Sequence, residues 1–503
     1  QFQRYAEADS LLKISEAKFL ERYGAKHSLM ALLATSRAQA LAQIGNYPAA
    51  MEKYETALQV YGYTTGMPWE SLVNPNPVLS TLQEKNHILI QLYQQSKSTA
   101  LAKTIEENFS EILTGLNYLR RNYQGSETKL LFAKQFKSAA VDAINWYQAM
   151  SDPQTLEKAW VFAEKSRSLA VLEAFLNTKA WQVKGASDST RITEELFAAA
   201  TKKWSKAYET AKTIAEKDSC YRLLLETRVS HESWLKELEQ RDSVFFNLKY
   251  SQNIVDIKSV QSALDEQQTL LEYFVADSSI YIFLIQPEHY EIVAVKKDAA
   301  FEQWITDLNS NGIYGYHALP RNNQNPILRE KTLKNYSSSA YKLYETLIAP
   351  VKAKLGKKVI IIPDGALGYV PFEALLTQKP PRPDAIGAYQ YLLKAHQISY
   401  CYSATLLREM RHKQHSQEPA QKLLAMAPFF LANSSNGFSR TDPPGNAGAR
   451  ETLTELPHSG PEVAAISKLL KGQAFLGKEA TLNKFQELAS GYRILHLSTH
   501  GKA

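Results

Sequence analysis

The end of the chain carries the residues that are best placed to do chemistry. The run 493–501, Arg-Ile-Leu-His-Leu-Ser-Thr-His-Gly, predicts a buried strand that delivers His500 to a turn marked by Gly501, and only two residues follow. The carboxyl ends of strands in a parallel sheet form the crevice in which such sheets bind ligands. An imidazole there can take a proton from a thiol or hydroxyl and return it to a leaving amine. We therefore consider His500 a candidate general base that requires a nucleophile, while noting that a single histidine is more often structural.

A metal site is the first alternative for this run, because His496 and His500 are four residues apart, as in zinc proteases. That motif works on a helix, where residues four apart share a face, and it has a glutamate after the first histidine. Here Leu497 follows His496, and four residues of a strand span roughly 13 Å, too far for one metal ion. We expect no metal site, and we expect His496 to pack within the sheet.

A phosphate-binding loop is the second alternative, since residues 472–478 have its glycine and lysine spacing. Glu479 occupies the position of the serine or threonine that binds magnesium, and residues 474–476 look like a strand rather than a nest of backbone N–H groups. We therefore expect no nucleotide at this loop and no cofactor in the chain.

Short apolar runs predict the strands that must position His500. Residues 270–275, 280–285 and 291–295 are typical of an antiparallel meander, because turn residues separate them. Strands, at 358–362, 398–402 and 423–427, then alternate with helices up to the last strand, 494–498. Such alternation favours a largely parallel sheet covered by helices.

Capping patterns place two helices before the last strand. The first begins at Ser459, has Pro461 in its first turn and ends at Gly472, and the second begins at Thr481 and ends at Gly491. We expect their buried stripes to be Val463, Ile466, Leu469 and Leu470 in the first, and Leu482, Phe485 and Leu488 in the second. Residues 431–453 have turn composition without periodicity, which predicts a long mobile loop, either an insertion or a regulatory or cleavable element.

The first part of the chain, residues 1–242, is predicted to be entirely helical, because apolar residues recur at helical spacing. Within residues 45–58, Tyr47, Ala50, Tyr54, Ala57 and Leu58 share one face. Tyr5 and Ala8 repeat the start of that pattern 42 residues earlier. This offset suggests a helical-hairpin repeat, with an irregular helical bundle as the alternative.

Composition narrows the possible functions. The 503 residues suffice for more than one core, and the net charge of +7 is spread thinly, so we expect no nucleic-acid surface. No stretch is apolar enough to span a membrane, and a cytoplasmic location is expected, although the absence of an initiator methionine leaves an exported or anchored form open. The two cysteines, Cys220 and Cys401, cannot form a disulfide framework.

Two family resemblances follow from these patterns. Residues 45–58 resemble a tetratricopeptide repeat, a family that stacks into a superhelix with a concave face for a protein or peptide partner. Residues 360–376, Ile-Ile-Ile-Pro-Asp-Gly-Ala-Leu-Gly-Tyr-Val-Pro-Phe-Glu-Ala-Leu-Leu, resemble the hallmark of CHAT domains, caspase-like peptidase relatives that follow such repeats. Further segments resemble the same family in its order: Phe162–Ala170, Gln261 with Leu270–Phe274, Ile398–Tyr400 with Ser403–Thr405, Leu456-Pro457 with Glu462-Val463, Gly477 with Ala480-Thr481, and Leu495–Gly501.

The CHAT resemblance implies roles for the end of the chain. His500 corresponds to the histidine of a catalytic Cys-His dyad, and the backbone N–H of Gly501 to a donor of the oxyanion hole. The family's nucleophilic cysteine lies on the next strand, and this sequence ends before it, so the domain is expected to be incomplete here. Cys401 lies in a segment that matches a non-catalytic strand, and Cys220 lies in helical sequence, so both are expected to be packed thiols.

The resulting hypothesis is an α plus α/β protein. A tetratricopeptide-like α-superhelix (residues 1–242) precedes a caspase-like α/β domain with a largely parallel sheet (residues 243–503), and the protein acts on a protein substrate as a cysteine peptidase regulated or targeted by its repeats. The alternative is a catalytically inactive scaffold that binds protein partners. A third hypothesis has the repeats keep the peptidase silent until a partner docks, so that deletion of residues 1 to about 148 would raise activity.

Overall fold

The computed structural model describes most of the chain as two compact units, Gln1–Arg411 and His412–Ala503. The described residues are 2–166, 188–241, 246, 255–319, 325–412, 419–429 and 456–500, apart from residues 26, 73, 123–125, 151–152 and 212. Three predictions concern residues outside these ranges: the loop at 431–453, the end of the family segment at 167–170, and Gly501.

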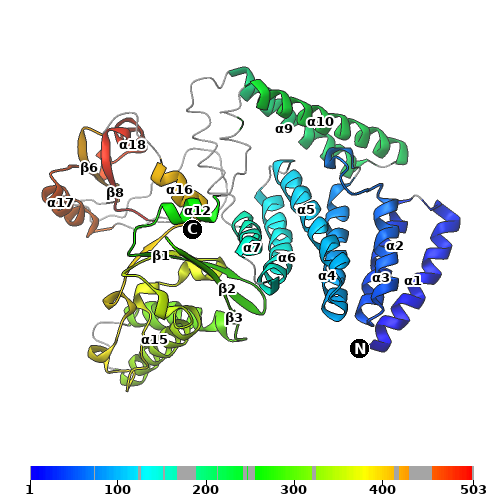
Figure 1. Ribbon diagram of the computed structural model, residues 1–503. Coiled ribbons are helices and arrows are strands. Elements are labelled where there is room, and N and C mark those ends of the chain that lie inside the picture. Colours follow the sequence, from blue (N-terminus) through cyan, green and yellow to red (C-terminus); the bar gives the residue numbers. More distant parts are fainter. Residues whose placement is uncertain are drawn as a thin grey trace. The chain divides into compact units, whose positions relative to one another are not determined.

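Helices alone make up the first part of the larger unit, as the sequence predicts, and no described residue before β1 lies in a strand (Figure 1). None of the described helices is long and apolar enough to cross a membrane. The long helices are α1 (Phe2–Tyr23), α2 (Ser28–Gln43), α3 (Tyr47–Val60), α4 (Pro75–Ser96), α5 (Thr99–Asn122), α6 (Ser126–Met150), α7 (Pro153–Lys165), α9 (Asp188–Thr210) and α10 (Ile214–Arg241).

Small residues let α2 and α3 approach each other closely. Ala31 and Ala34 of α2 pack with Ala57 of α3, and all three side chains are fully buried. Ala38 of α2 and Ala50 of α3 belong to a second buried cluster, with Leu41 and Tyr54. The predicted buried face of α3 is therefore confirmed, and the reason is steric, since alanine adds little bulk between two helix backbones.

A five-stranded sheet follows the helices in the larger unit, in the order β3-β2-β1-β4-β5. Its strands are β1 (Gln268–Val275), β2 (Ser279–Gln286), β3 (His289–Lys296), β4 (Lys358–Ile362) and β5 (Gln397–Tyr400). The first three strands pair antiparallel, which confirms the predicted meander. β4 pairs parallel with both β1 and β5. The sheet is therefore mixed, and its parallel part lies at the β1-β4-β5 side.

The two faces of this sheet are covered by different helices. On one face, Leu270 and Phe274 of β1 share a core with α4, α5, α6 and α7. On the other face, Leu271 and Tyr273 share a core with α13 (Phe301–Leu308) and α15 (Pro326–Leu347). Because side chains alternate along a strand, β1 supplies both cores and is buried throughout its interior. The helical array and the sheet are thus joined by one continuous hydrophobic core.

The smaller unit is a three-stranded parallel sheet in the order β7-β6-β8. It alternates β6 (Gln421–Ala427), α17 (Ser459–Leu470), β7 (Gln473–Leu476), α18 (Leu482–Leu488) and β8 (Tyr492–Leu497). One face of β6 packs against α17, and the other packs against α18. The predicted alternation of strands and helices is confirmed here, and β7 is a strand where the phosphate-loop spacing occurs.

Short elements connect these parts. They are η1 (Trp69–Ser71), α12 (Ile257–Ser262), η2 (Asn309–Tyr314), α14 (Gly315–His317), η3 (Lys352–Lys354), η4 (Gly365–Tyr369), η5 (Phe372–Ala374), η6 (Ile386–Ala388), η7 (Leu392–Lys394), α16 (Ala404–His412), η8 (Gly477–Glu479) and η9 (Ala489–Gly491).

Local predictions for α17 need correction at both ends. Ser459 is the first helical residue and makes no capping bond; its hydroxyl donates to the carbonyl oxygen of Leu456 at 2.7 Å. The helix ends at Leu470, and the left-handed residue after it is Lys471 rather than Gly472. Gly472 is needed for a different reason, because a Cβ there would lie 2.5 Å from the side chain of Leu423.

Two residues predicted to be buried are exposed. The side chain of Leu469 is 79% exposed, and that of Leu482 is 68% exposed. Val463, Ile466 and Leu470 form the side of α17 that covers β6, and Leu469 is turned about 100° away from Leu470 around the helix axis. Leu482 is the first residue of α18, whose contacts with the sheet come from Phe485 and Leu488. The predicted cap of α18 is confirmed, since the hydroxyl of Thr481 accepts from the N–H of Lys484.

Candidate functional site

The strand β8 places His500 immediately beyond its carboxyl end. β8 pairs parallel with β6, with Leu495 opposite Leu424 and Leu497 opposite Met426. Pairing continues one residue further, because the N–H of Ser498 donates to the carbonyl oxygen of Met426 at 2.9 Å. His500 thus lies at the edge of a parallel sheet where such sheets bind ligands, as predicted.

The prediction that this strand is buried is wrong. Only Tyr492 of β8 is buried, while Ile494, Leu495 and Leu497 are 47%, 45% and 50% exposed. The reason is topological: β8 lies at one edge of the sheet, and within the described residues it has β6 as its sole neighbour. An apolar run does not distinguish an interior strand from such an edge.

A carboxylate on α17 holds the end of β8. Glu462, in the first turn of α17, accepts from the hydroxyl of Ser498 at 2.7 Å, and its other oxygen lies 3.1 Å from Nε2 of His496. A negative charge at a helix N-terminus is favoured by the helix dipole. Instead of packing within the sheet, His496 therefore binds Glu462, and both contacts fix the strand within four residues of His500.

The imidazole of His500 is oriented by an aromatic neighbour. Its ring meets the ring of Phe429 edge to face, with centroids 4.9 Å apart and planes at 74°. Phe429 follows β6, so the residues after two adjacent parallel strands meet here. This contact restrains the imidazole, and His500 is half-buried. A backbone role for Gly501 stays a prediction, because that residue is outside the described ranges.

The two cysteines are poor nucleophiles in this structure. The thiol of Cys401 packs against the core of the larger unit and donates to the carbonyl oxygen of Ser403 at 3.3 Å. Burial raises the pKa of the Cys401 thiol above its ordinary value, which reduces the fraction of reactive thiolate. Cys220 is half-buried in α10. Both observations fit packed thiols.

The Pro-Asp-Gly part of the hallmark segment is a structural joint. After β4, the carboxylate of Asp364 accepts from the N–H of Val275 at 2.7 Å and from Nζ of Lys137 on α6 at 3.1 Å. Gly365 follows with a φ of 54°, a left-handed conformation that glycine adopts without strain. Asp364 thereby ties the ends of β1 and β4 to the helical array.

A second joint connects two more of the family segments. Glu164, at the end of α7, accepts from the N–H of Thr405 at 2.7 Å, in the first turn of α16. The indole N–H of Trp160 on α7 donates to the carbonyl oxygen of Val255 at 3.0 Å. Segments 241 residues apart therefore meet in one buried contact. The sequence resemblance placed these segments in order but did not predict that they touch.

A cavity of about 1090 Å³ opens between the helical array and the turn after β1. Its wall consists of Gln39, Ala42 and Gln43 of α2, Tyr54 of α3, Asn76, Ser80, Gln83, Glu84, His87 and Ile88 of α4, Gln135, Lys137, Ser138, Val141 and Asp142 of α6, and Ala276, Asp277 and Ser278 of the turn. The sequence-based search for sites missed it. The available signal is a polar stripe on α4 at helical spacing, made by Asn76, Ser80, Gln83, Glu84 and His87.

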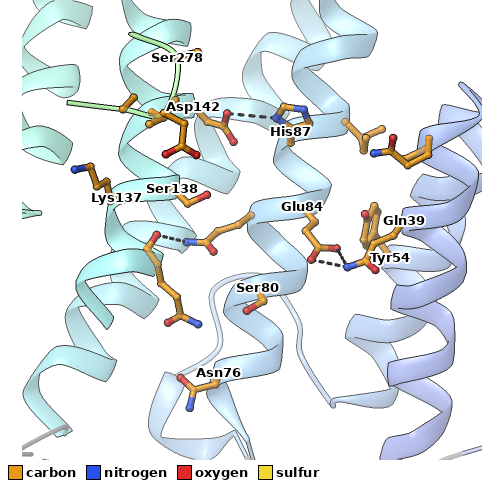
Figure 2. A pocket seen from close by; sticks show the side chains of 18 residues that line it. Gln39, Tyr54, Asn76, Ser80, Glu84, His87, Lys137, Ser138, Asp142 and Ser278 are labelled. Atoms are coloured by element: carbon orange, nitrogen blue, oxygen red, sulfur yellow. Dashed lines mark hydrogen bonds and ion pairs between the residues drawn. The ribbon is translucent and has the colours of Figure 1, made fainter. Parts of the chain in front are cut away.

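Two polar pairs organise the cavity wall, and both are visible in Figure 2. Glu84 accepts from the side-chain amide of Gln39, at 2.9 and 3.0 Å to its two oxygens, and burial raises the pKa of Glu84. Nδ1 of His87 lies 3.3 Å from the carboxylate of Asp142, and this contact raises the pKa of His87. The charged side chains thus point into the space between α2, α4 and α6.

Comparison with known families addresses the last third of the chain. Residues 337–503 match the family model of the CHAT domain. The match starts within α15 and includes the hallmark segment, β4 to β8 and His500. It supports the caspase-like peptidase family predicted from sequence. No curated protein matches the chain.

Proposed function

We propose that this protein is a caspase-like cysteine peptidase in which His500 is the general base. One observation carries the proposal: His500 follows the carboxyl end of a parallel strand inside the segment that matches the CHAT domain. Because neither Cys220 nor Cys401 suits the role, the nucleophile is a cysteine other than these two. The backbone N–H of Gly501 completes the proposed site as an oxyanion-hole donor.

The proposed reaction requires His500 to accept a proton and later to donate it. The imidazole takes the proton of the cysteine thiol, and the thiolate attacks the carbonyl carbon of the scissile peptide bond. The tetrahedral intermediate collapses to an acyl-enzyme as His500 passes that proton to the leaving amine, and water then releases the acid product. The contact with Phe429 and the tie between Ser498 and Glu462 supply the fixed orientation that such a transfer needs.

The helical region is proposed to be a tetratricopeptide-like superhelix that binds a protein or peptide partner. The cavity supports this proposal, because α2, α4 and α6 supply most of its wall. These are the first helices of the closely packed successive pairs α2–α3, α4–α5 and α6–α7, so one helix of each pair faces the same space. The boundary at residues 242/243 is part of the same proposal.

Labelling with a peptide that carries a thiol-reactive acyloxymethyl ketone tests the peptidase proposal. We expect the full-length protein to be labelled at one cysteine, and His500→Ala to abolish that labelling. His317→Ala is the matched control, because His317 is an exposed histidine of the larger unit. If labelling is absent, or persists unchanged in His500→Ala, the peptidase proposal fails.

A catalytically inactive scaffold is the second candidate. The observation that favours it is that both cysteines, Cys220 and Cys401, are packed and lie outside residues 412–503, the unit that contains His500. In that case the CHAT segment only supports the partner-binding helices. The labelling experiment separates the two candidates, because a scaffold shows no labelling that depends on His500.

A further inference from the structure

The cavity beside α4 carries an excess of negative charge. Its wall contains three carboxylates, Glu84, Asp142 and Asp277, and two basic side chains, His87 and Lys137. Both basic groups are already engaged, His87 with Asp142 and Lys137 with Asp364 outside the wall. Asp277 is exposed on the turn after β1, and the structure gives it no hydrogen bond or ion pair with any described residue. Asp277 has no basic partner among the described residues, and His87 contacts one oxygen of Asp142 and leaves the other as an acceptor, so an incoming cation would meet acceptors on both side chains.

Carboxamides line the rest of the wall. Gln39, Gln43, Asn76, Gln83 and Gln135 all border the cavity. A carboxamide carries both a donor and an acceptor, the same pair of groups that each unit of an extended peptide backbone presents. An array of them along α2, α4 and α6 suits a peptide backbone better than an apolar ligand. The volume of about 1090 Å³ exceeds that of most small-molecule pockets.

We propose that this cavity binds an extended peptide segment carrying a lysine or arginine side chain, which Asp142 and Asp277 hold between α6 and the turn after β1. The proposal deepens the partner-binding part of the proposed function by naming the chemistry of the partner. A bound peptide would contact both the helical array and the sheet of the larger unit. It would also lie beside Lys137, the residue that reaches Asp364 of the hallmark segment.

Selection from a phage library of random hexapeptides tests the ligand class with the whole chain as bait. We expect the selected peptides to share a lysine or arginine at one position. Fluorescence anisotropy with a fluorescein-labelled selected peptide then gives its affinity, and the same peptide with norleucine in place of the basic residue should bind on the order of tenfold more weakly. This peptide change does not alter the protein, so its result does not depend on how any variant folds.

Variants of the wall locate the site. Asp142→Asn combined with Asp277→Asn should weaken the lysine peptide on the order of tenfold and leave the norleucine peptide unchanged. Glu52→Gln on α3 is the matched control, because Glu52 is exposed and borders no part of the cavity. Gln43→Ala should weaken both peptides alike, since it removes a backbone contact rather than a charge.

Several outcomes would overturn the proposal. Selection of acidic or purely apolar peptides, or of none, would show that the cavity does not take a basic segment. A free polyamine would be the occupant if spermidine bound with the same affinity as the selected peptide and displaced it, and if Gln43→Ala did not weaken peptide binding. None of these measurements depends on His500, so failure here leaves the peptidase proposal standing, and failure of thiol labelling leaves this one standing.

Discussion

The central strand of the larger sheet and the last strand of the smaller sheet have similar apolar sequences and opposite surroundings. The interior residues of β1 are all buried, with helices α4 to α7 on one face and α13 and α15 on the other. β8 has the apolar residues Ile494, Leu495 and Leu497, each about half exposed. The apolar composition of the two strands does not explain their different burial. The number of strands and helices that the fold places beside each of them does.

This difference shows which interactions fix the position of each strand. β1 is held by packing, and its position follows from the volume of the core around it. Among the described residues, β8 is held by backbone pairing to β6 and by the carboxylate of Glu462. Within the part of the chain that the structure describes, the candidate general base therefore follows the strand with less packing, and a few directional polar contacts set its geometry.

The largest loss of stability is expected for a substitution where the helices pack against the larger sheet. Trp160 is fully buried, packs edge to face on Phe283, and donates to the carbonyl oxygen of Val255. Trp160→Ala should lower the free energy of unfolding of the larger unit by about 3–5 kcal/mol. Urea denaturation followed by circular dichroism measures this loss.

Ile494→Ala in β8 is the matched substitution for Trp160→Ala. Because Ile494 is 47% exposed, its truncation should cost less than about 1 kcal/mol. Equal losses for the two variants would show that β8 is as well packed as the α7 contact with the sheet. The inferred difference in packing between β1 and β8 would then be wrong.

This continuous core also bears on the idea that deleting residues 1 to about 148 would release an inhibited peptidase. The deletion would remove α4, α5 and most of α6, whose residues share a core with β1. A shortened protein would expose that apolar surface, and a change in its activity would reflect loss of folding. Single substitutions in the cavity wall avoid this problem, because they leave the core intact.

The second prediction concerns the polar tie of β8. Glu462→Gln removes the charge that binds Ser498 and His496, and because the Glu462 side chain is 47% exposed it should destabilise the end of β8 by about 1 kcal/mol. Amide exchange at Ser498 should become about fivefold faster, since 1.4 kcal/mol is a factor of ten. Hydrogen exchange read by mass spectrometry measures it.

Glu487→Gln is the control for Glu462→Gln, because Glu487 lies exposed on α18 and should leave that exchange unchanged. The same pair of variants tests whether the tie positions His500. Labelling that depends on His500 should slow in Glu462→Gln and not in Glu487→Gln. Unchanged exchange and labelling in Glu462→Gln would mean that backbone pairing alone holds β8.

Much of the fold could be predicted from local signals. β4 occupies 358–362 as expected, because four consecutive β-branched residues between turns are typical of a buried parallel strand. The position of Thr481 before an apolar helix predicts a cap, and its hydroxyl accepts from the N–H of Lys484. These features depend on a few neighbouring residues, so one sequence contains them in full.

Features that depend on distant residues could not be predicted. The burial of β8 depends on which strands lie beside it, and the ion pair between Lys137 and Asp364 joins residues 227 positions apart. The cavity draws its wall from α2, α3, α4, α6 and a turn. His500 could be identified as a candidate because its signal is local. Its supports, Phe429 and Glu462, come from two other elements.

A smaller effect is expected at the joint of the hallmark segment. Asp364→Asn keeps an acceptor for the N–H of Val275 but loses the ion pair with the half-buried Lys137. A double-mutant cycle with Lys137→Met should give a coupling free energy of about 0.5–1 kcal/mol. The exposed pair Lys103 and Glu107 on α5 is the control and should give less. Equal couplings would show that the joint is only a surface ion pair.

The smallest effect is the pH dependence of the pair His87 and Asp142 in the cavity wall. The contact raises the pKa of His87 above its ordinary value, so protonated His87 is favoured in the folded state. The stabilisation is therefore complete below pH 6.5, the ordinary value, and disappears as the pH rises through the higher folded pKa. Because the His87 side chain is 54% exposed, this stabilisation should amount to only a few tenths of a kcal/mol.

The pKa of His87 is a better readout than stability, because Glu84, Asp277 and Lys137 border the same cavity. In protein labelled with ¹³C-histidine, Asp142→Asn should lower the His87 pKa toward its ordinary value, and Glu52→Gln should not. An unchanged His87 pKa in Asp142→Asn would mean that another carboxylate of the wall, Glu84 or Asp277, raises it.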